Sequence, residues 1–185
     1  MKDDELEATP AGGSGAQDDG GVYDKVRRRL LWSMPTGLYI LGVKDLDKVH
    51  LMTTSWATQV ATSPKIIAIS VESKSKTAAC LVESPSFVLA LLPKSRRELI
   101  RKFVKSTQHV EVLDDRFVVE GVEFFPSSMG NPYPTGAIGY LEASVVFVQR
   151  FESHNVYFGE VSDAVELQSH DEVLSMADTR MNYGG

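Results

Sequence analysis

The chain has 185 residues, a length typical of one domain, and its apolar (43%) and charged (24%) fractions are ordinary for a globular protein. Its net charge of −6 at pH 7 is concentrated at the N-terminus, where residues 1–20 hold six acidic side chains and one lysine, which leaves the rest of the chain at −1. A nearly neutral folded part argues against a surface built for nucleic acid or for an anionic membrane.

Cys80 is the only cysteine, so no intramolecular disulfide can form, and no Cys/His cluster has the spacing of metal ligands. We therefore predict no metal site, and we interpret Cys80 as a small buried hydrophobic residue. No apolar run approaches the ~20 residues that a membrane span needs, and the acidic N-terminus lacks the features of a signal peptide. These features predict a cytoplasmic protein with no membrane partner.

Residues 1–20 are rich in glycine, alanine and acid and have almost nothing to bury, which predicts a disordered tail. A folded domain is expected over residues 21–170, followed by a C-terminal tail over residues 171–185. The domain is predicted to begin with a short amphipathic helix that Pro35 and Gly37 end. The helix is indicated by apolar residues at helical spacing, namely Val22, Val26, Leu30 and Leu31.

Most of the remaining chain has the pattern of β-strands, rich in β-branched and aromatic residues and bounded by turn-forming residues. The predicted strands are residues 37–43, 49–53, 66–71, 87–92, 118–124, 137–150 and 156–165. Two helices interrupt them, one from near Ser75 through Leu81 and one over residues 96–104. Many strands without regular βαβ alternation predict a closed or nearly closed antiparallel barrel.

The helix predicted over residues 96–104 has a capping-box arrangement, because Ser95 precedes Glu98 by three residues. Its apolar residues pair at a spacing of four: Leu99 with Phe103, and Ile100 with Val104. Its basic residues are interpreted as a solvated face, with attraction for a nucleotide as the alternative. They are Lys94, Arg96, Arg97, Arg101, Lys102 and Lys105.

Common catalytic signatures are absent from the sequence, which contains no G-x-S-x-G, Walker loop, H-E-x-x-H or G-x-G-x-x-G after a strand. Two polar segments stand out instead: residues 52–60, rich in hydroxyl groups, and residues 72–77, between a buried strand and a helix. Hydroxyls, two lysines and the free N–H groups of a helix N-terminus form a reasonable phosphate cradle. The alternative is that Ser75 or Thr77 only caps the helix.

Four runs carry a resemblance to a known family: TGLYILGV at 36–43, the segment from Leu51 to Thr77, SPSFVLALL at 84–92, and HNVYFGEV at 154–161. Together, over roughly Leu30 to Val165, the sequence resembles the flavin reductase-like, FMN-binding split-barrel family. The resemblance implies a mainly β fold: an antiparallel, Greek-key-like split barrel of about six strands with two or three short helices.

The resemblance also implies FMN, or alternatively FAD, as the cofactor, and it assigns ten residues to its binding. Four are expected beside the ribityl chain and the flavin edge: Thr53, Thr54, Ser55 and Trp56. The backbone of Ser70, Val71 and Glu72 is expected at the pyrimidine ring, and Ser75, Lys76 and Thr77 at the 5′-phosphate. From the residues alone, Trp56 could equally be a core aromatic.

The implied function is NAD(P)H-dependent flavin reduction by a homodimer with FMN at the subunit interface, which supplies an acceptor such as a flavin-dependent monooxygenase. His154 is the candidate contact for the nicotinamide or the flavin ring, although a lone histidine at a strand start is commonly a surface residue. Family reductases often carry Gly-Asp-His here, whereas residues 152–154 are Glu-Ser-His. This departure favours the alternative of a flavin-binding or electron-carrying protein without an NAD(P)H site. A split barrel adapted to haem or another cofactor is a third interpretation.

Overall fold

The computed structural model describes residues 20–46, 48–104, 109–169, 172–179 and 181. The tail predicted over residues 1–20 therefore lies, apart from Gly20, outside the described residues. The chain divides into two compact units, residues 1–34 with 184–185 and residues 35–183, which are described separately.

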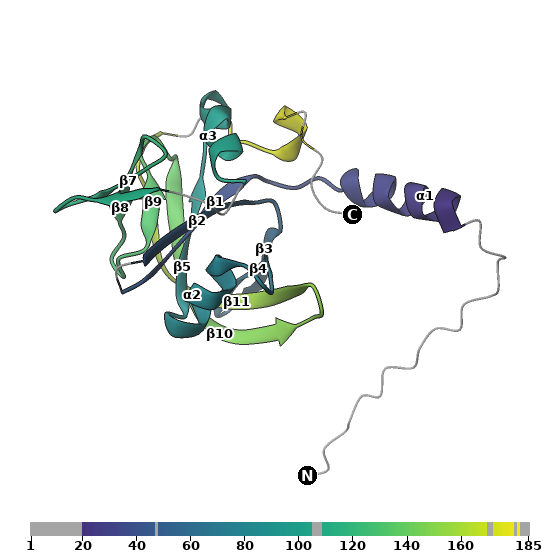
Figure 1. The fold of residues 1–185 in the computed structure, drawn as a ribbon, viewed down its shortest axis with the longest axis horizontal. Coiled ribbons are helices and arrows are strands. Elements are labelled where there is room, and N and C mark those ends of the chain that lie inside the picture. The colour runs from purple at the N-terminus through teal and green to yellow at the C-terminus, as the bar shows by residue number, and fades with distance from the viewer. Residues whose placement is uncertain (1–19, 47, 105–108, 170–171, 180, 182–185) are drawn as a thin grey trace, which may run out of the picture. The chain divides into compact units, whose positions relative to one another are not determined.

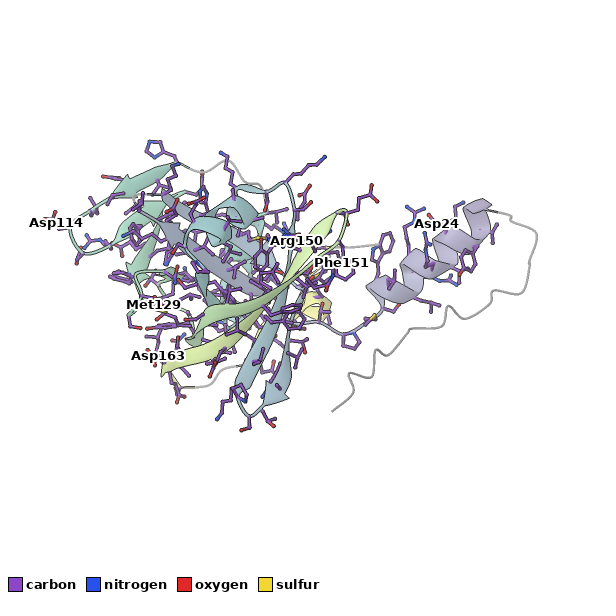
Figure 2. All side chains as sticks on the ribbon, turned by 90° about the horizontal axis from the view of Figure 1, so that it is seen from below. Asp24, Asp114, Met129, Arg150, Phe151 and Asp163 are labelled. Carbon is purple, nitrogen blue, oxygen red and sulfur yellow. The ribbon has the colours of Figure 1, made fainter. Side chains whose placement is uncertain are left out.

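The first unit contains the predicted amphipathic helix, α1 (Gly20–Trp32), which the structure confirms. Asp24, labelled in Figure 2, forms ion pairs with Arg27 and with Arg28, the latter at 2.9 Å. The helix ends at Trp32, shortly before Pro35, and the Ser33 hydroxyl donates to the Arg29 carbonyl at 2.8 Å. Across the described residues, no helix combines the length and apolar character needed to cross a membrane.

The second unit is mainly β, as predicted, and is built from two antiparallel sheets (Figure 1). The larger sheet has seven strands in the order β2-β1-β5-β10-β11-β4-β3, with β2 and β3 as its edges. Its strands are β1 (Tyr39–Asp45), β2 (Lys48–Thr54), β3 (Ala57–Thr62), β4 (Lys65–Glu72), β5 (Ser86–Leu91), β10 (Gly139–Arg150) and β11 (His154–Glu166). The described sheets thus contain more strands than the six or so that were expected.

The smaller sheet has the order β6-β7-β8-β9 and lies beside β1 and β5 in Figure 1. Its strands are β6 (Val110–Val112), β7 (Phe117–Val119), β8 (Val122–Pro126) and β9 (Pro132–Pro134). The single strand predicted over residues 118–124 is wrong, because Glu120 and Gly121 adopt positive φ (50° and 70°) and turn the chain into the β7–β8 hairpin. Two successive positive-φ residues are the signature of a two-residue hairpin turn.

Both helices predicted in this unit are present. α2 (Lys76–Glu83) begins at the N-cap Ser75, and a 3-10 turn (Lys94–Arg96) leads into α3 (Arg97–Lys102). The capping box predicted at Ser95 is wrong, because the N-cap of α3 is Arg96 and Glu98 instead forms an ion pair with the Arg96 guanidinium at 3.0 Å. The 3-10 turn shifts the start of the helix by one residue and leaves Ser95 outside the cap position.

Two apolar clusters fill the interior of the second unit. One joins β1, β2 and β5 to α3 and the smaller sheet, and the other joins β1 and β4 to α2. Close packing of the two sheets requires Gly42, where a Cβ would lie 2.0 Å from the Pro132 carbonyl oxygen. The segment predicted as a C-terminal tail, residues 171–185, contributes Leu174 to the core. The Leu174 amide donates to the Leu92 carbonyl at 2.8 Å.

Glu142 on β10 is fully buried and fixes the loop between β8 and β9. Its carboxylate accepts hydrogen bonds from the Ser127 and Ser128 hydroxyls, from the Met129 amide at 3.2 Å and from Asn131 Nδ2 at 3.4 Å. A buried carboxylate is tolerated only when donors surround it. These bonds therefore tie the smaller sheet to the larger one.

Candidate functional site

The polar segments singled out in the sequence meet in one cleft, formed by β2, β4, the start of α2, the residues after α3 and the start of β11. The cleft has a volume of about 110 Å³. Eight of the eleven predicted site residues line it: Thr53, Trp56, Ser70, Glu72, Ser75, Lys76, Thr77 and His154. Thr54, Ser55 and Val71 do not line it, because Thr54 and Ser55 are buried at the end of β2 and just after it, and Val71 lies in the core.

Thr53 fixes one wall of the cleft to the end of α3. Its hydroxyl donates to the Ile100 carbonyl at 2.7 Å, and its amide donates to the Phe103 carbonyl at 3.0 Å. The Thr53 hydroxyl thus donates its proton within the protein, to the Ile100 carbonyl. Its function in this geometry is to hold Phe103 and the following Val104 at the cleft, which both of them line.

Trp56 lies between the edge strands β2 and β3 and forms part of the cleft wall. It is half-buried and belongs to neither apolar cluster, so its position is that of a wall residue rather than a core aromatic. The Trp56 amide donates to the Thr54 hydroxyl at 3.2 Å, and the Trp56 carbonyl accepts from the Ser70 amide at 2.9 Å. These bonds fix the backbone that carries the ring.

His154 packs edge-on against Trp56, with ring centroids 5.0 Å apart and an interplanar angle of 62°. It begins β11 in register with Glu72, and its Nδ1 lies 3.0 Å from the Ser153 hydroxyl. The turn before it is held by Ser73, whose hydroxyl donates to the carbonyls of residues 152 and 153 at 3.2 Å each. The structure therefore brings together a histidine and a tryptophan that are 98 residues apart in sequence.

The start of α2 presents polar groups to the same cleft. Ser75 is the N-cap, and its hydroxyl accepts from the Ala78 amide at 3.1 Å, so the helix-capping interpretation is correct for this residue. Thr77 is only 5% exposed, and its hydroxyl has no hydrogen-bond partner among the described residues. The first amides of a helix also lack carbonyl partners one turn back. A nearly buried donor without a partner, next to free amides and the Lys76 ammonium, suits an anion.

His50 also lines the cleft, and the sequence interpretation assigned it no role. Burial lowers the pKa of His50, the positive charges of Lys76 and Lys48 lower it further, and Asp45 opposes them. The alternation of β2 places His50 on the same face as Met52, which also lines the cleft. Leu51 and Thr53, on the other face of β2, line the cleft as well, so no alternation in the sequence singles out His50.

No group of three or more His, Cys, Asp or Glu side chains within the described ranges is placed to hold a metal ion. Cys80 is buried on α2, and burial is the main cause that raises the pKa of its thiol to about 11. A thiol with this pKa stays protonated at neutral pH and is a poor nucleophile. The chemistry of the cleft therefore rests on hydroxyl, ammonium, imidazole, aromatic and backbone groups.

Comparison with known proteins adds independent information. Residues 31–185 match the sequence profile of the flavin reductase like domain. The high molecular weight rubredoxin of Moorella thermoacetica is 28% identical over 142 residues, which are 75% of this chain but only 59% of that protein. The chain thus spans less than two thirds of this curated relative.

Two solved structures have similar folds. The NADH:FAD oxidoreductase SgcE6 of Streptomyces globisporus has a TM-score of 0.68 at 23% identity, with 85% of this chain and 89% of that chain covered. The styrene monooxygenase flavin reductase of Pseudomonas putida S12 has a TM-score of 0.64 at 20% identity, with 75% and 85% covered. At these identities the likeness concerns the fold.

Proposed function

Because this chain belongs to the flavin reductase-like domain family, we propose that it is an NAD(P)H-dependent flavin reductase that binds FMN in the cleft between Trp56 and the start of α2. The observation that carries the proposal is the convergence, in one cleft, of an anion-binding helix end and an aromatic wall from distant parts of the sequence. FMN has a dianionic phosphate at one end and a flat ring at the other, which matches this division.

The phosphate end is assigned to Thr77, Lys76 and the first amides of α2. Thr77 supplies a hydroxyl donor that the protein itself does not use, and Lys76 supplies a positive charge. Ser75 holds the helix end in shape through its bond to the Ala78 amide and can donate its own proton outward.

The ring end is assigned to Trp56 and to the backbone of β4. The pairing of β3 with β4 ends at Ile69 on β4, and one further hydrogen bond joins the Ser70 amide to the Trp56 carbonyl. The backbone of Glu72 therefore lies beyond the last residue of β4 that bonds to this side. Backbone amides on alternate residues of a strand point to the same side, which directs the Glu72 N–H toward the cleft. A pyrimidine-like ring edge carries acceptors that such a donor can bind.

When bound, the flavin supplies the chemistry of hydride acceptance, and the protein positions the reactants. His154 forms the edge of the site where a nicotinamide ring would stack, and its contact with Trp56 fixes the imidazole plane. Phe103 and Val104 supply apolar surface to the same cleft. Hydride transfer from the nicotinamide to the flavin requires no proton transfer by the residues of this chain.

We propose further that the site is completed by a second copy of the chain. The cleft volume of about 110 Å³ is well below the ~300 Å³ or more that sites for cofactor-sized ligands enclose. One protomer therefore covers only part of the flavin. A homodimer with FMN at its interface would supply the other wall.

The hairpin of β10 and β11 supports this assembly. β5 pairs with β10 only as far as Ser144, so the backbone edge of β10 beyond Val145 has no neighbouring strand on that side in the described part of the chain. The same segment exposes Val146, Phe147 and Phe151 by more than half. Figure 2 shows Arg150 and Phe151 at the tip of this hairpin, at the opposite end from Met129 and Asp163. An apolar, unpaired strand edge is a surface that proteins normally cover.

Under this proposal the protein resides in the cytoplasm, and reduced flavin leaves for an acceptor such as a monooxygenase. The Pseudomonas protein of similar fold is a styrene monooxygenase flavin reductase, which is in keeping with such an acceptor. A non-catalytic flavin carrier is the second candidate. It is favoured by the Glu-Ser-His sequence at residues 152–154, where a Gly-Asp-His turn is absent.

Steady-state oxidation of NADH and NADPH by the purified protein, with added FMN and with added FAD, tests the function. Turnover well above that of free flavin supports the reductase. Tight FMN binding without oxidation of NADH or NADPH would contradict the reductase function and favour the flavin-carrier function. Sedimentation with and without FMN tests assembly, and a monomer that binds FMN tightly would contradict the shared site.

A further inference from the structure

His50 on β2 lines the cleft assigned to FMN but has no part in the hydride transfer proposed there. Its imidazole is half-buried, and within the part of the chain that the structure describes its ring nitrogens form no hydrogen bond. Met52, two residues along the strand and on the same face, packs against the apolar cluster that contains α2. His50 therefore faces α2, and a half-buried polar group without a partner there indicates a ligand.

His50 lies at the phosphate end of the cleft, away from the ring end. Thr54, whose hydroxyl accepts from the Trp56 amide, is four residues further along β2. At ~3.3 Å of rise per residue in a strand, that separation is about 13 Å. Lys76 on α2, in contrast, is close enough to His50 for its positive charge to lower the pKa of the imidazole. His50, Lys76 and Thr77 thus form one end of the cleft, and Trp56 belongs to the other.

The three groups at the phosphate end have hydrogen-bonding capacity that the described part of the protein leaves unused. Thr77 is 5% exposed, its hydroxyl has no hydrogen-bond partner in that part, and Lys76 has no ion-pair partner in it. The oxygens of one phosphate can accept from a hydroxyl, an ammonium and an imidazole at once. The cleft volume of about 110 Å³ keeps these three groups around a single anion.

The charges around His50 keep its imidazole neutral when no anion is bound. Burial is the main cause that lowers its pKa, and the two nearest lysines lower it further. A phosphate dianion beside Lys76 reverses this balance, because its negative charges offset the ammonium groups that disfavour an imidazolium. The titratable groups that face His50 come from five elements: Lys48 on β2, Asp45 on β1, Lys76 on α2, Glu72 on β4 and His154 on β11.

From this arrangement we propose that His50 is a proton-coupled ligand of the flavin phosphate, taking a proton from solvent as the phosphate binds and returning it when the flavin leaves. The resulting imidazolium donates to a phosphate oxygen beside Lys76 and Thr77. The inference rests on the proposed function, because it requires FMN with its phosphate at the start of α2. FMN binding thereby gains strength from His50 at low pH and loses that contribution as the pH rises. Riboflavin, which has no phosphate, gains nothing from it.

The test compares the wild type with His50→Gln, which removes the titrating group. Flavin fluorescence quenching gives the dissociation constants of FMN and riboflavin from pH 6 to pH 8.5. The matched control is His109→Gln, which replaces an exposed histidine that does not line the cleft. His154 is present in all three proteins, so its titration and that of the flavin phosphate cancel when the variant is divided by the wild type.

The variant-to-wild-type ratio of FMN dissociation constants should rise about three- to tenfold between pH 8.5 and pH 6. A pKa raised by one unit on binding corresponds to at most a factor of ten in affinity, and part of that factor is realised at pH 6. The same ratio for riboflavin should stay within about twofold, as should both ratios for His109→Gln.

An NMR titration of the wild type gives an independent reading that does not depend on any variant's stability. The His50 imidazole signal is assigned by its absence from His50→Gln. Saturating FMN should raise the pKa of His50 by about one unit, and riboflavin should leave it unchanged, because proton uptake and FMN affinity are reciprocally linked.

A ratio for FMN that is constant across pH, an equal rise for riboflavin, or a His50 pKa that FMN leaves unchanged would overturn the inference. Failure of the proposed reductase function gives a different result. In that case FMN binds with the expected pH-dependent ratio, yet the wild type oxidises neither NADH nor NADPH. A wild type that binds no FMN would overturn both.

Discussion

The phosphate assignment at the start of α2 can be tested by changing charge without changing the fold. Ser75 is the N-cap of α2, with its hydroxyl accepting from the Ala78 amide. Aspartate and asparagine cap helices about as well as serine, so Ser75→Asp and Ser75→Asn should both keep the helix. Only the aspartate adds a negative charge where the FMN phosphate is proposed to bind.

The expected size of the effect follows from the geometry. A carboxylate at the cap lies about one hydrogen-bonding contact from an anion held by the first amides of α2. Two unit charges about 4 Å apart repel by about 4 kcal/mol at an effective dielectric constant of about 20, before screening by salt. We therefore expect Ser75→Asp to weaken FMN binding by about 3 kcal/mol, or about 150-fold, and Ser75→Asn by no more than about 1 kcal/mol.

Flavin fluorescence quenching gives the dissociation constants of FMN and riboflavin for the three proteins, and thermal unfolding without flavin checks the helix. Riboflavin lacks the phosphate, so its affinity should be the same in all three. The melting temperature of Ser75→Asp should be unchanged or slightly higher, because a negative charge is favourable at a helix N-terminus. Wild-type FMN affinity in Ser75→Asp, or equal losses for FMN and riboflavin, would refute the assignment.

Three further predictions concern the rest of the site and the fold. His154→Ala should lower NAD(P)H turnover about tenfold, or about 1.4 kcal/mol of barrier, with little change in the FMN dissociation constant, because only the transient nicotinamide depends on this edge contact beside Trp56. Stopped-flow reduction at fixed FMN measures it, and an equal fall in both quantities would contradict the division of roles. His50 has a lowered pKa, caused first by burial and then by Lys76, so the unfolded chain binds its proton more readily. The free energy of unfolding should thus fall as the pH decreases below about 6.5, and urea titrations should find a shallower fall in His50→Gln, whereas identical slopes would contradict it. Glu142→Ala should lower the free energy of unfolding by about 3 kcal/mol or more, because it leaves buried donors unpaired, and Glu142→Gln should cost less. Urea unfolding of the two variants checks the order, and equal losses would contradict it, because they would show that the isosteric amide satisfies none of the donors around the carboxylate.

Much of the local structure was predictable from the sequence because it depends on short-range patterns. The apolar spacing of α1, the β-branched runs of the larger sheet and the cap at Ser75 all follow from neighbouring residues. The errors fall where a backbone conformation departs from what the side chains favour. Glu120 at positive φ splits one predicted strand into a hairpin, and a 3-10 turn moves the start of α3 past Ser95.

The sequence by itself determined the strand-rich composition, the polar run at residues 75–77 to which phosphate binding is proposed, and the resemblance to a flavin-binding family. Only the tertiary structure decided which polar groups share the cleft. It joins Trp56 to His154 across 98 residues, adds His50 and Val104, and withdraws Thr54 and Ser55 into the interior. The physical reason is that a cleft in a barrel is formed by strand ends and helix ends brought together by long-range pairing, and no local pattern records which ends will meet.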